Sequence, residues 1–376
     1  MTKMLNEYQQ SALYLQAERS PVPGIANPQP HQLYRNPQLD IRSRQLGPIF
    51  PGHIRVQMIY AGICGTDIHL VNPDLLTGYV QSSAPAYLPD EGRLIGHEGV
   101  GKILEVASDV TGLTVCQFVA FESIQSCHAC EACRQGQFNQ CLNSKLIGME
   151  VNGIFGTVVD IPAILAFDVS RFGNSDRSLQ AAACLEPAGV AFLACANAAV
   201  SASDRVAILG AGPIGLLTVM LCRLAFGASF VSVVEPSEYR KSLARKWADE
   251  SLTPDQFKND HGVFDVLIDT SGDLDLVSAS ITRLRHNGRV CLLARSGRAL
   301  VVDSVDHIIS SNISIMGSRG HLGGIYERLA ALYENGRLPI DEIVTKVISG
   351  LSELAEHLKT PDLVTQNNCK VLCRFD

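Results

Sequence analysis

The hydrophobic pattern changes partway along the chain, and the change predicts two parts of different architecture. In the first part, short apolar runs stand between glycines, at residues 54–60, 99–106 and 118–121. Short apolar runs bounded by glycine are typical of antiparallel strands. The pattern therefore predicts a partly closed antiparallel β-barrel over this region.

The second part begins at about residue 178, where longer segments of helical period appear. Residues 181–199 are alanine-rich and predict one helix. Further on, apolar runs that predict strands alternate with segments that predict helices: strands at 206–209, 231–234, 266–269 and 289–293, and helices at 213–226 and 237–248. That alternation is typical of a doubly wound parallel sheet. Residues 322–335 and 352–358 also predict helices, and residues 370–375 predict a last strand.

The N-terminal region shows little periodicity. Residues 20–52 are rich in Pro, Gln and Asn, and we expect an irregular segment with a short strand or two. Residues 1–20 mix charged and polar side chains, so they do not form a secretory signal. The apolar stretch 206–224 is interrupted by glycine and carries Arg223, so no membrane span is expected.

Composition narrows the class of protein. A chain of 376 residues, with 46% hydrophobic and 18% charged residues, indicates a globular protein of two or three domains. The net charge of −7 leaves no basic footprint for nucleic acid. Twelve cysteines without a secretory signal indicate reduced thiols in a cytoplasmic protein, some of them binding metal.

Four cysteines form the most informative motif. They are spaced C-x2-C-x2-C-x7-C, at Cys127, Cys130, Cys133 and Cys141. Four thiolates favour a closed tetrahedral zinc site, which is structural because it leaves no open position for chemistry. An iron–sulfur cluster or a disulfide pair are the alternatives, although the spacing fits neither common ferredoxin pattern.

A glycine-rich turn predicts a dinucleotide site. The strand at 206–209 runs into G-x-G-x-x-G, with Gly210, Gly212 and Gly215 around Ala211, Pro213 and Ile214. The glycines permit a tight turn, close approach of a pyrophosphate and close helix–strand packing. Glu235 follows the next strand, where a carboxylate accepts the ribose hydroxyls of NAD and repels the 2′-phosphate of NADP. Arg240 nearby is the argument for NADP.

Three upstream residues are candidates for a second metal site. Cys64 and His97 offer a thiolate and an imidazole, the ligand types that zinc prefers. Each also has an ordinary interpretation, as a buried small side chain and as a core histidine. Glu186 lies in the apolar run 181–195, where a carboxylate is costly unless it meets a cation.

The order of these motifs resembles the zinc-dependent medium-chain dehydrogenases of the alcohol dehydrogenase superfamily. The resemblance covers about residues 53–320 and rests on Cys64-Gly-Thr66-Asp67-Ile-His69, Gly96-His97-Glu98, the four-cysteine lobe, Glu186-Pro187 and the glycine turn. Within the superfamily the chain is similar to the sorbitol, threonine and glucose dehydrogenase branch, which carries Glu-Pro in place of a third zinc cysteine.

The resemblance implies a role for each matched residue. Cys64 and His97 would hold a catalytic zinc, with Glu98 and Glu186 competing for the third position. Asp67 would orient His97. Thr66 would take the substrate proton and pass it on by way of His69. The residues implied at the cofactor are the glycine turn with Pro213 and Ile214, together with Glu235, Arg240, Thr270 and Arg319.

The resemblance also implies the overall organisation. A GroES-like catalytic domain would comprise residues 1–187 and 319–376, with the structural zinc lobe at about 122–146 and a Rossmann domain at 188–318. The implied activity is NAD-dependent oxidation of a secondary alcohol in a polyol, sugar or amino alcohol, with two zinc ions per chain, in a homodimer or homotetramer. An NADP-linked aldehyde or ketone reductase and a non-catalytic nucleotide-binding protein are the alternatives.

Three departures from the family bear on specificity. Residues 75–93 form an insertion-rich loop ahead of Gly96, and the segment before His53 is longer than usual. Where relatives often show a Gly-Asp-Arg-Val turn, this chain reads Cys116-Gln-Phe-Val119. None of the three departures removes a residue implied in catalysis.

Overall fold

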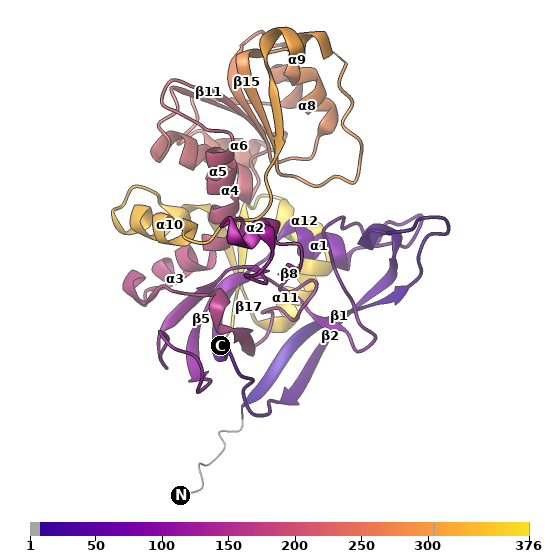
Figure 1. Cartoon of the computed structure of the whole chain (residues 1–376), viewed down its shortest axis with the longest axis vertical. Coiled ribbons are helices and arrows are strands. Elements are labelled where there is room, and N and C mark those ends of the chain that lie inside the picture. The colour runs from indigo at the N-terminus through magenta and orange to yellow at the C-terminus, as the bar shows by residue number, and fades with distance from the viewer. Residues whose placement is uncertain (1–7, 304, 376) are drawn as a thin grey trace, which may run out of the picture. The chain divides into compact units, whose positions relative to one another are not determined.

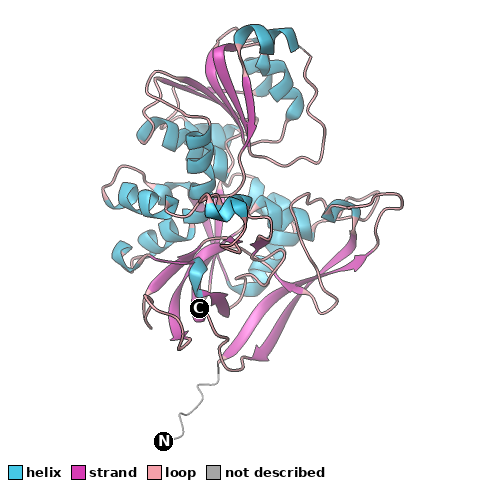
Figure 2. Ribbon diagram, in the orientation of Figure 1, coloured by secondary structure: helices cyan, strands magenta, loops and turns pink. Residues whose placement is uncertain are grey.

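The computed structural model describes residues 8–303 and 305–375, which form two compact units (Figures 1 and 2). The first unit contains residues 8–186, 344–366 and 371–375, and the second contains the described residues of 187–343 together with 367–370. The expected catalytic domain also took in residues 1–7 and 376, which lie outside the described residues.

The first unit is built on antiparallel sheets. A three-stranded sheet has the order β2-β1-β4, a seven-stranded sheet follows the path β10-β6-β5-β3-β18-β17 with β9 paired to β3, and β7 pairs with β8. The strands are β1 (Gln9–Arg19), β2 (Tyr34–Gln45), β3 (His53–Gly62), β4 (Arg93–Leu94), β5 (Glu98–Val106), β6 (Phe118–Phe121), β7 (Ile124–Gln125), β8 (Lys145–Leu146), β9 (Val158–Pro162), β10 (Ala166–Asp168), β17 (Val344–Ser349) and β18 (Lys370–Arg374). The GroES-like architecture expected from the sequence is confirmed.

The helices of the first unit are short. They are α1 (Gly65–Val71), α2 (Glu131–Arg134), α3 (Asp176–Ala183), α11 (Gly350–Lys359) and α12 (Pro361–Thr365). Single 3-10 turns are found at Pro30–Gln32, Phe138–Gln140, Ala163–Leu165 and Ser170–Phe172 in this unit, and at Ile340–Ile343 in the second.

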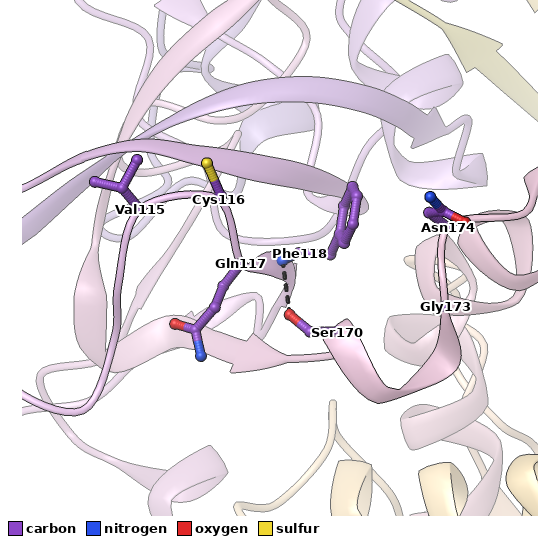
Figure 3. A pocket seen from close by; sticks show the side chains of 7 residues that line it. All are labelled: Val115, Cys116, Gln117, Phe118, Ser170, Gly173 and Asn174. Atoms are coloured by element: carbon purple, nitrogen blue, oxygen red, sulfur yellow. Dashed lines mark hydrogen bonds between the residues drawn. The ribbon is translucent and has the colours of Figure 1, made fainter.

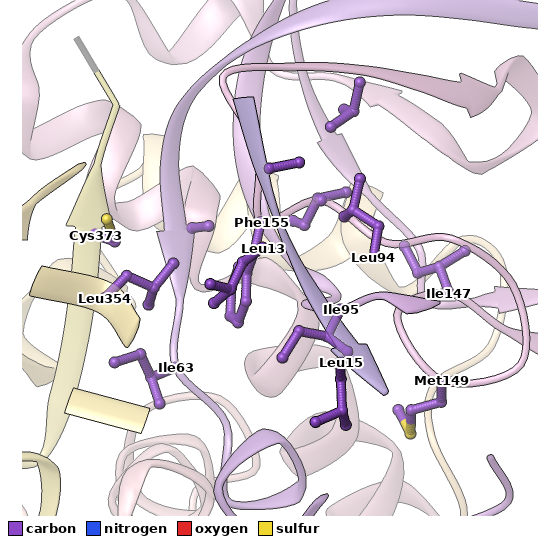
Figure 4. Close-up of a cluster of buried hydrophobic side chains, with 14 of the residues drawn as sticks. Leu13, Leu15, Ile63, Leu94, Ile95, Ile147, Met149, Phe155, Leu354 and Cys373 are labelled. Atoms are coloured by element: carbon purple, nitrogen blue, oxygen red, sulfur yellow. The ribbon is translucent and has the colours of Figure 1, made fainter. Parts of the chain in front are cut away.

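Residues 20–52 contain one strand, β2, where an irregular segment with a short strand or two was expected, and this strand has twelve residues. It pairs with β1, which was not predicted, in a long antiparallel ladder that begins with Gln9 opposite Gln45. Leu13 and Leu15 of β1 are fully buried, and Figure 4 shows them beside Ile95 and Phe155 in the core of this unit. Most side chains of β2 are exposed, so its sequence shows almost no alternation of hydrophobic and polar residues. The strand forms because it pairs with β1.

The second unit is a doubly wound α/β domain, as expected. Its six parallel strands have the order β13-β12-β11-β14-β15-β16. They are β11 (Arg205–Leu209), β12 (Phe230–Val234), β13 (Glu250–Leu252), β14 (Phe264–Asp269), β15 (Leu284–Leu292) and β16 (Ser314–Gly317). The helices are α4 (Leu185–Asn197), α5 (Pro213–Leu224), α6 (Glu238–Ala244), α7 (Pro254–Asn259), α8 (Leu274–Ile281), α9 (Val305–Ser311) and α10 (Ile325–Glu334). The strand order reverses between β11 and β14, which is where ligands bind in such sheets.

Two boundaries differ from the expected ones. Residues 319–343, expected in the catalytic domain, pack with the second unit, and the chain returns to the first unit at Val344. Helix α10 explains this, because Leu329 and Ala330 are fully buried within the second unit.

The single helix expected at 181–199 is two helices, because α3 ends before Cys184 and α4 begins at Leu185.

Among the described residues, no single helix is both long and apolar enough to cross a membrane. Helices α3 and α4 meet that criterion only when taken together, and they are bent by 50° at the break between them.

Candidate metal centres and cofactor site

Cys64 and His97 meet because their strands are neighbours. Strands β3 and β5 pair antiparallel, with Gly62 opposite Glu98. The chain leaves β3 just before Cys64 and enters β5 just after His97, so both side chains arrive at the same end of the sheet. Cys64 is also the N-cap of α1, where its backbone N–H donates to Asp67 Oδ2 at 3.0 Å.

The donor atoms of Cys64, His97 and Glu98 all lie within 4.8 Å of one another. His97 and Glu98 are buried, and Cys64 is half-buried. His97 Nε2 lies 3.9 Å from a Glu98 oxygen, and Nδ1 lies 3.5 Å from Asp67 Oδ1. This geometry turns Nδ1 toward a buried carboxylate and Nε2 toward the other donors, as in carboxylate–histidine–zinc arrangements.

The charges and the burial of the side chains in this cluster favour a bound cation. Burial, and then the charge of Glu98, raise the pKa of the Cys64 thiol. Burial lowers the pKa of His97, but Asp67 and Cys64 outweigh it and hold that pKa well above its ordinary value. A buried thiol, imidazole and carboxylate are stabilised as ligands by a divalent metal ion, so the donor set fits zinc.

The backbone before His97 is held by close packing that only glycine permits. Gly96 has a φ of +90°, and a Cβ at this position would stand 2.3 Å from Cδ1 of Phe155. The Gly96 carbonyl accepts a hydrogen bond from the N–H of Ile154 at 3.0 Å. These contacts fix the peptide that leads into His97.

Glu186, the other candidate third ligand, is placed differently. It lies in the first turn of α4 and is not a member of the 4.8 Å group. Its Oε1 accepts a hydrogen bond of 2.6 Å from the hydroxyl of Ser123. Thr66 and His69 lie on α1, in the same short helix as Asp67. Partial burial lowers the pKa of His69, although its side chain keeps contact with solvent.

The four cysteines of the lobe come together around α2. The sulfur atoms of Cys127, Cys130, Cys133 and Cys141 lie within 4.8 Å of one another. Backbone N–H groups point at them: the N–H of Cys130 donates to Cys127 Sγ at 3.4 Å, and the N–H of Cys127 donates to Cys141 Sγ at 3.3 Å.

The pKa values of the lobe cysteines differ because their surroundings differ. Hydrogen bonds from the backbone N–H groups of Ala129 and Cys130 lower the pKa of Cys127 to about 6, whereas burial raises that of Cys133 to about 12. N–H groups aimed at sulfur stabilise thiolates, so this lobe fits a metal that binds four of them.

A cavity of about 330 Å³ lies at the carboxyl ends of the strands in the second unit. Its lining comes from the ends of β11, β12, β13 and β14 and from the turns and helices that follow: Gly210, Gly212, Val234, Glu235, Pro236, Arg240, Pro254, Thr270, Ser271, Asp273 and Leu276. Five expected cofactor residues therefore share one cavity. Pro254, Asp273 and Leu276 carry no motif, and the sequence analysis missed them.

The glycine turn has the properties expected of a pyrophosphate cradle. Gly210 has a φ of +96°, and a Cβ on Gly215 would stand 2.1 Å from the Gly210 oxygen. A Cβ on Gly212 would meet nothing within 4 Å, so there is room for a ligand at this point. The turn precedes the N-terminus of α5, whose backbone N–H groups and positive dipole end favour an anion.

Glu235 is tied to this turn. One carboxylate oxygen accepts from the N–H of Ala211 at 2.8 Å and the other from the N–H of Ser237 at 3.0 Å. Arg240 lines the same cavity, and its Nε donates to the carbonyl of Asn368. Arg319 lies beyond the end of β16 and does not line this cavity.

A second hollow, of about 450 Å³, lies in the first unit (Figure 3). Val115, Cys116 and Ser170 are among its lining residues, and Figure 3 shows the hydrogen bond of 3.0 Å from the N–H of Phe118 to the Ser170 hydroxyl. None of the residues expected at the metal or cofactor sites lines it. Cys116 is exposed and has a φ of +76°, at the position where relatives often have glycine.

Comparison with known proteins agrees with these sites. The alcohol dehydrogenase GroES-like domain matches residues 50–171, and the zinc-binding dehydrogenase domain matches residues 213–335. L-threonine 3-dehydrogenase of Pyrococcus horikoshii is 30% identical over 81% of this chain and 87% of that protein.

Solved structures share the fold. L-idonate 5-dehydrogenase of Escherichia coli K-12 has a TM-score of 0.77 and 22% identity, covering 98% of this chain and 99% of that one. The 2R,3R-butanediol dehydrogenase of Bacillus subtilis has a TM-score of 0.77 and 22% identity, covering 97% and 99%. Taken with the buried thiol–imidazole pair and the cysteine lobe, these matches show that the chain belongs to the zinc-dependent medium-chain dehydrogenases of the alcohol dehydrogenase superfamily.

Proposed function

We propose that this protein oxidises a secondary alcohol of a polyol, sugar or amino alcohol, with NAD as the hydride acceptor. The observation that carries the proposal is the cluster of Cys64, His97 and Glu98, whose donor atoms lie within 4.8 Å of one another. A thiolate, an imidazole and a carboxylate are a three-ligand set that leaves a zinc ion one open position. The names of the relatives, which act on threonine, idonate and butanediol, support the substrate class.

Two zinc ions per chain are proposed, one catalytic and one structural. Cys64, His97 and Glu98 would hold the first, and the four lobe cysteines would hold the second. When bound, the catalytic zinc supplies a positive charge that lowers the pKa of an alcohol, and the nicotinamide supplies the hydride acceptor.

The remaining chemistry belongs to side chains of this chain. Asp67 fixes the ring of His97, so that Nε2 stays directed at the other donors. Thr66 accepts the hydroxyl proton of the substrate, and His69, which keeps contact with solvent, carries it away. Arg319 follows β16 at the carboxyl edge of the parallel sheet, and we assign to it a contact with nicotinamide or substrate when these are bound.

The preference for NAD rests on Glu235. Its carboxylate is buried at the edge of the cavity, with both oxygens fixed by backbone N–H groups. A carboxylate held in this way repels the 2′-phosphate of NADP. Arg240 in the same cavity favours the second candidate function, an NADP-linked aldehyde or ketone reductase. Assembly as a homodimer or homotetramer is proposed from the family alone.

A substrate panel on zinc-replete protein tests the proposal, with NAD and NADP compared by absorbance of the reduced cofactor. The panel holds sorbitol, xylitol, glucose, galactose, threonine, butanediol, an inositol and ethanol. We expect turnover of a polyol, sugar or amino alcohol with NAD, and its loss in Cys64→Ser. Turnover confined to NADP would support the reductase. No turnover by a protein that contains zinc and binds NADH would support a non-catalytic nucleotide-binding protein.

A further inference from the structure

Ser123 is a buried serine with a short hydrogen bond to a candidate metal ligand. Its hydroxyl donates to Glu186 Oε1 at 2.6 Å, and the two residues are 4% and 7% exposed. Hydrogen bonds to a charged carboxylate are about twice as strong as those between neutral groups, and burial strengthens them further. Ser123 therefore restrains the Glu186 carboxylate strongly.

Both partners are held on rigid backbone. Ser123 stands between β6 and β7, and its carbonyl accepts a hydrogen bond of 3.1 Å from the N–H of Ile147. The neighbouring N–H, that of Glu122, donates to the Leu165 carbonyl at 2.8 Å. Glu186 lies in the first turn of α4, where the helix dipole stabilises a carboxylate. The hydrogen bond is thus set by the fold and not by a mobile loop.

We infer that Ser123 is a positioning residue, which keeps Glu186 from joining Cys64, His97 and Glu98 as a fourth protein ligand. The inference rests on the proposed function, because it assigns the third ligand position to Glu98 and the open position to the substrate alcohol. In the structure Glu186 is indeed outside the group of donors that Glu98 belongs to. Movement of the Glu186 carboxylate toward the metal would break its hydrogen bond to Ser123, so this bond favours the position that the carboxylate has in the structure.

Removal of the hydroxyl should release Glu186 toward the metal. In Ser123→Ala we expect Glu186 to occupy the open position and to compete with the alcohol. The Michaelis constant for the alcohol should then rise by about tenfold, with a smaller change in kcat, because a hydrogen bond to a charged group no longer restrains the competing carboxylate. Ser123→Thr keeps the hydroxyl and should restore the wild-type Michaelis constant.

The decisive readout is the visible spectrum of the protein with Co²⁺ in the catalytic site, because it reports coordination without turnover. Four-coordinate Co²⁺ absorbs more strongly than five-coordinate Co²⁺. We expect Ser123→Ala to weaken the d–d bands and to slow removal of the metal by a chelator. The double variant Ser123→Ala with Glu186→Gln should return both values toward those of Glu186→Gln alone. Ser126→Ala, three residues further on, is the matched control and should leave the spectrum unchanged.

The outcomes separate this inference from the proposed function. An unchanged cobalt spectrum in Ser123→Ala, together with an unchanged Michaelis constant, would overturn the inference and leave the proposed function standing. A fall in thermal stability with the wild-type spectrum would overturn it too, since it would show a merely structural role. Absence of any Cys64-dependent cobalt band in the wild-type protein would overturn both.

Discussion

Asp67 Oδ1 lies 3.5 Å from Nδ1 of His97, while the other oxygen of the same carboxylate accepts the backbone N–H of Cys64. One buried carboxylate therefore contacts two of the three residues proposed as ligands of the catalytic zinc, Cys64 and His97. The Asp67 side chain orients the imidazole ring of His97 directly. It orients the thiol of Cys64 indirectly, by holding the backbone of Cys64 at the start of α1.

Replacement of Asp67 by Asn should weaken metal binding at this site. The amide keeps the shape but loses the charge that supports the ring of His97, and loss of such a partner lowers metal affinity by about 10–100-fold. Competition with a chromophoric chelator measures the effect. Asp74→Asn, in an exposed loop nearby, is the control. Equal zinc affinity in both variants would show that Asp67 has no part in holding the metal.

The cysteine lobe should bind its own metal ion. Cys133→Ser removes one of four thiolates, so we expect the zinc content to fall from about two to about one atom per chain, because a structural site needs its complete ligand set. Elemental analysis of the purified protein measures this. Cys116→Ser changes an exposed cysteine outside the lobe and should keep both zinc ions. A Cys133→Ser protein with the wild-type zinc content would argue against the assignment.

Acid should reduce turnover through His69. Partial burial lowers the pKa of this histidine, so the ring is neutral at pH 7 and able to accept a proton. Because the pKa of His69 is lower in the folded protein than in the unfolded chain, protonation of this residue favours unfolding. Its contribution to the free energy of unfolding is therefore complete above about pH 6.5 and is lost as the pH falls. We expect kcat to fall on the acid side as the ring protonates. In His69→Asn this limb of the pH profile should disappear and kcat should be lower throughout. An acid limb unchanged in the variant would assign it to another group.

Substitution of Glu235 should change the cofactor preference. Glu235→Gln keeps the length of the side chain but removes the charge that disfavours a 2′-phosphate, while Arg240 remains in the cavity. We expect the Michaelis constant for NAD to rise by about tenfold, since a hydrogen bond to a charged group is lost, and that for NADP to fall. Steady-state kinetics with each cofactor measures both. Glu250→Gln, on β13 and outside the cavity, is the control. A wild-type enzyme that already prefers NADP would contradict the role given to Glu235.

Cys116→Gly should stabilise the protein. Cys116 has a φ of +76°, and this conformation costs a residue with a Cβ about 1–2 kcal/mol. Glycine avoids this strain, but it also gives the unfolded chain more conformational entropy, which cancels part of the gain. The expected gain is therefore about 1 kcal/mol, measured as a higher urea midpoint with an unchanged slope. Val115→Gly, at the preceding position, gains nothing from the substitution and should be neutral or destabilising. A lower midpoint for Cys116→Gly would mean that the thiol makes a contact that outweighs the strain.

Sequence patterns predicted those elements that bury a regular face. Four of the six parallel strands, β11, β12, β14 and β15, were predicted because buried side chains such as those of Val206 and Ile208 form clear apolar runs. Strands β13 and β16 are short and have no fully buried residue, and they were not predicted. A short strand or two was expected within residues 20–52, but the position and length of β2 were not predicted because most of its side chains face solvent. The end of the catalytic unit was misplaced because α10 packs by long-range contacts. Ser123 could not be found from the sequence, since a lone serine carries no motif.

The sequence by itself determined the donors: four closely spaced cysteines, the Cys64 and His97 pair, the glycine turn and Glu235. Their chemistry follows from residue type and spacing, which are local properties. Only the tertiary structure decided which donors meet. Antiparallel pairing of β3 with β5 brings His97 and Glu98 to Cys64, whereas Glu186 accepts a hydrogen bond from Ser123 and is not a member of that group of donors. Cys64 and Glu98 are 34 positions apart in the sequence, and Ser123 and Glu186 are 63 positions apart. Contacts over such separations depend on strand register and packing, and no local pattern encodes them.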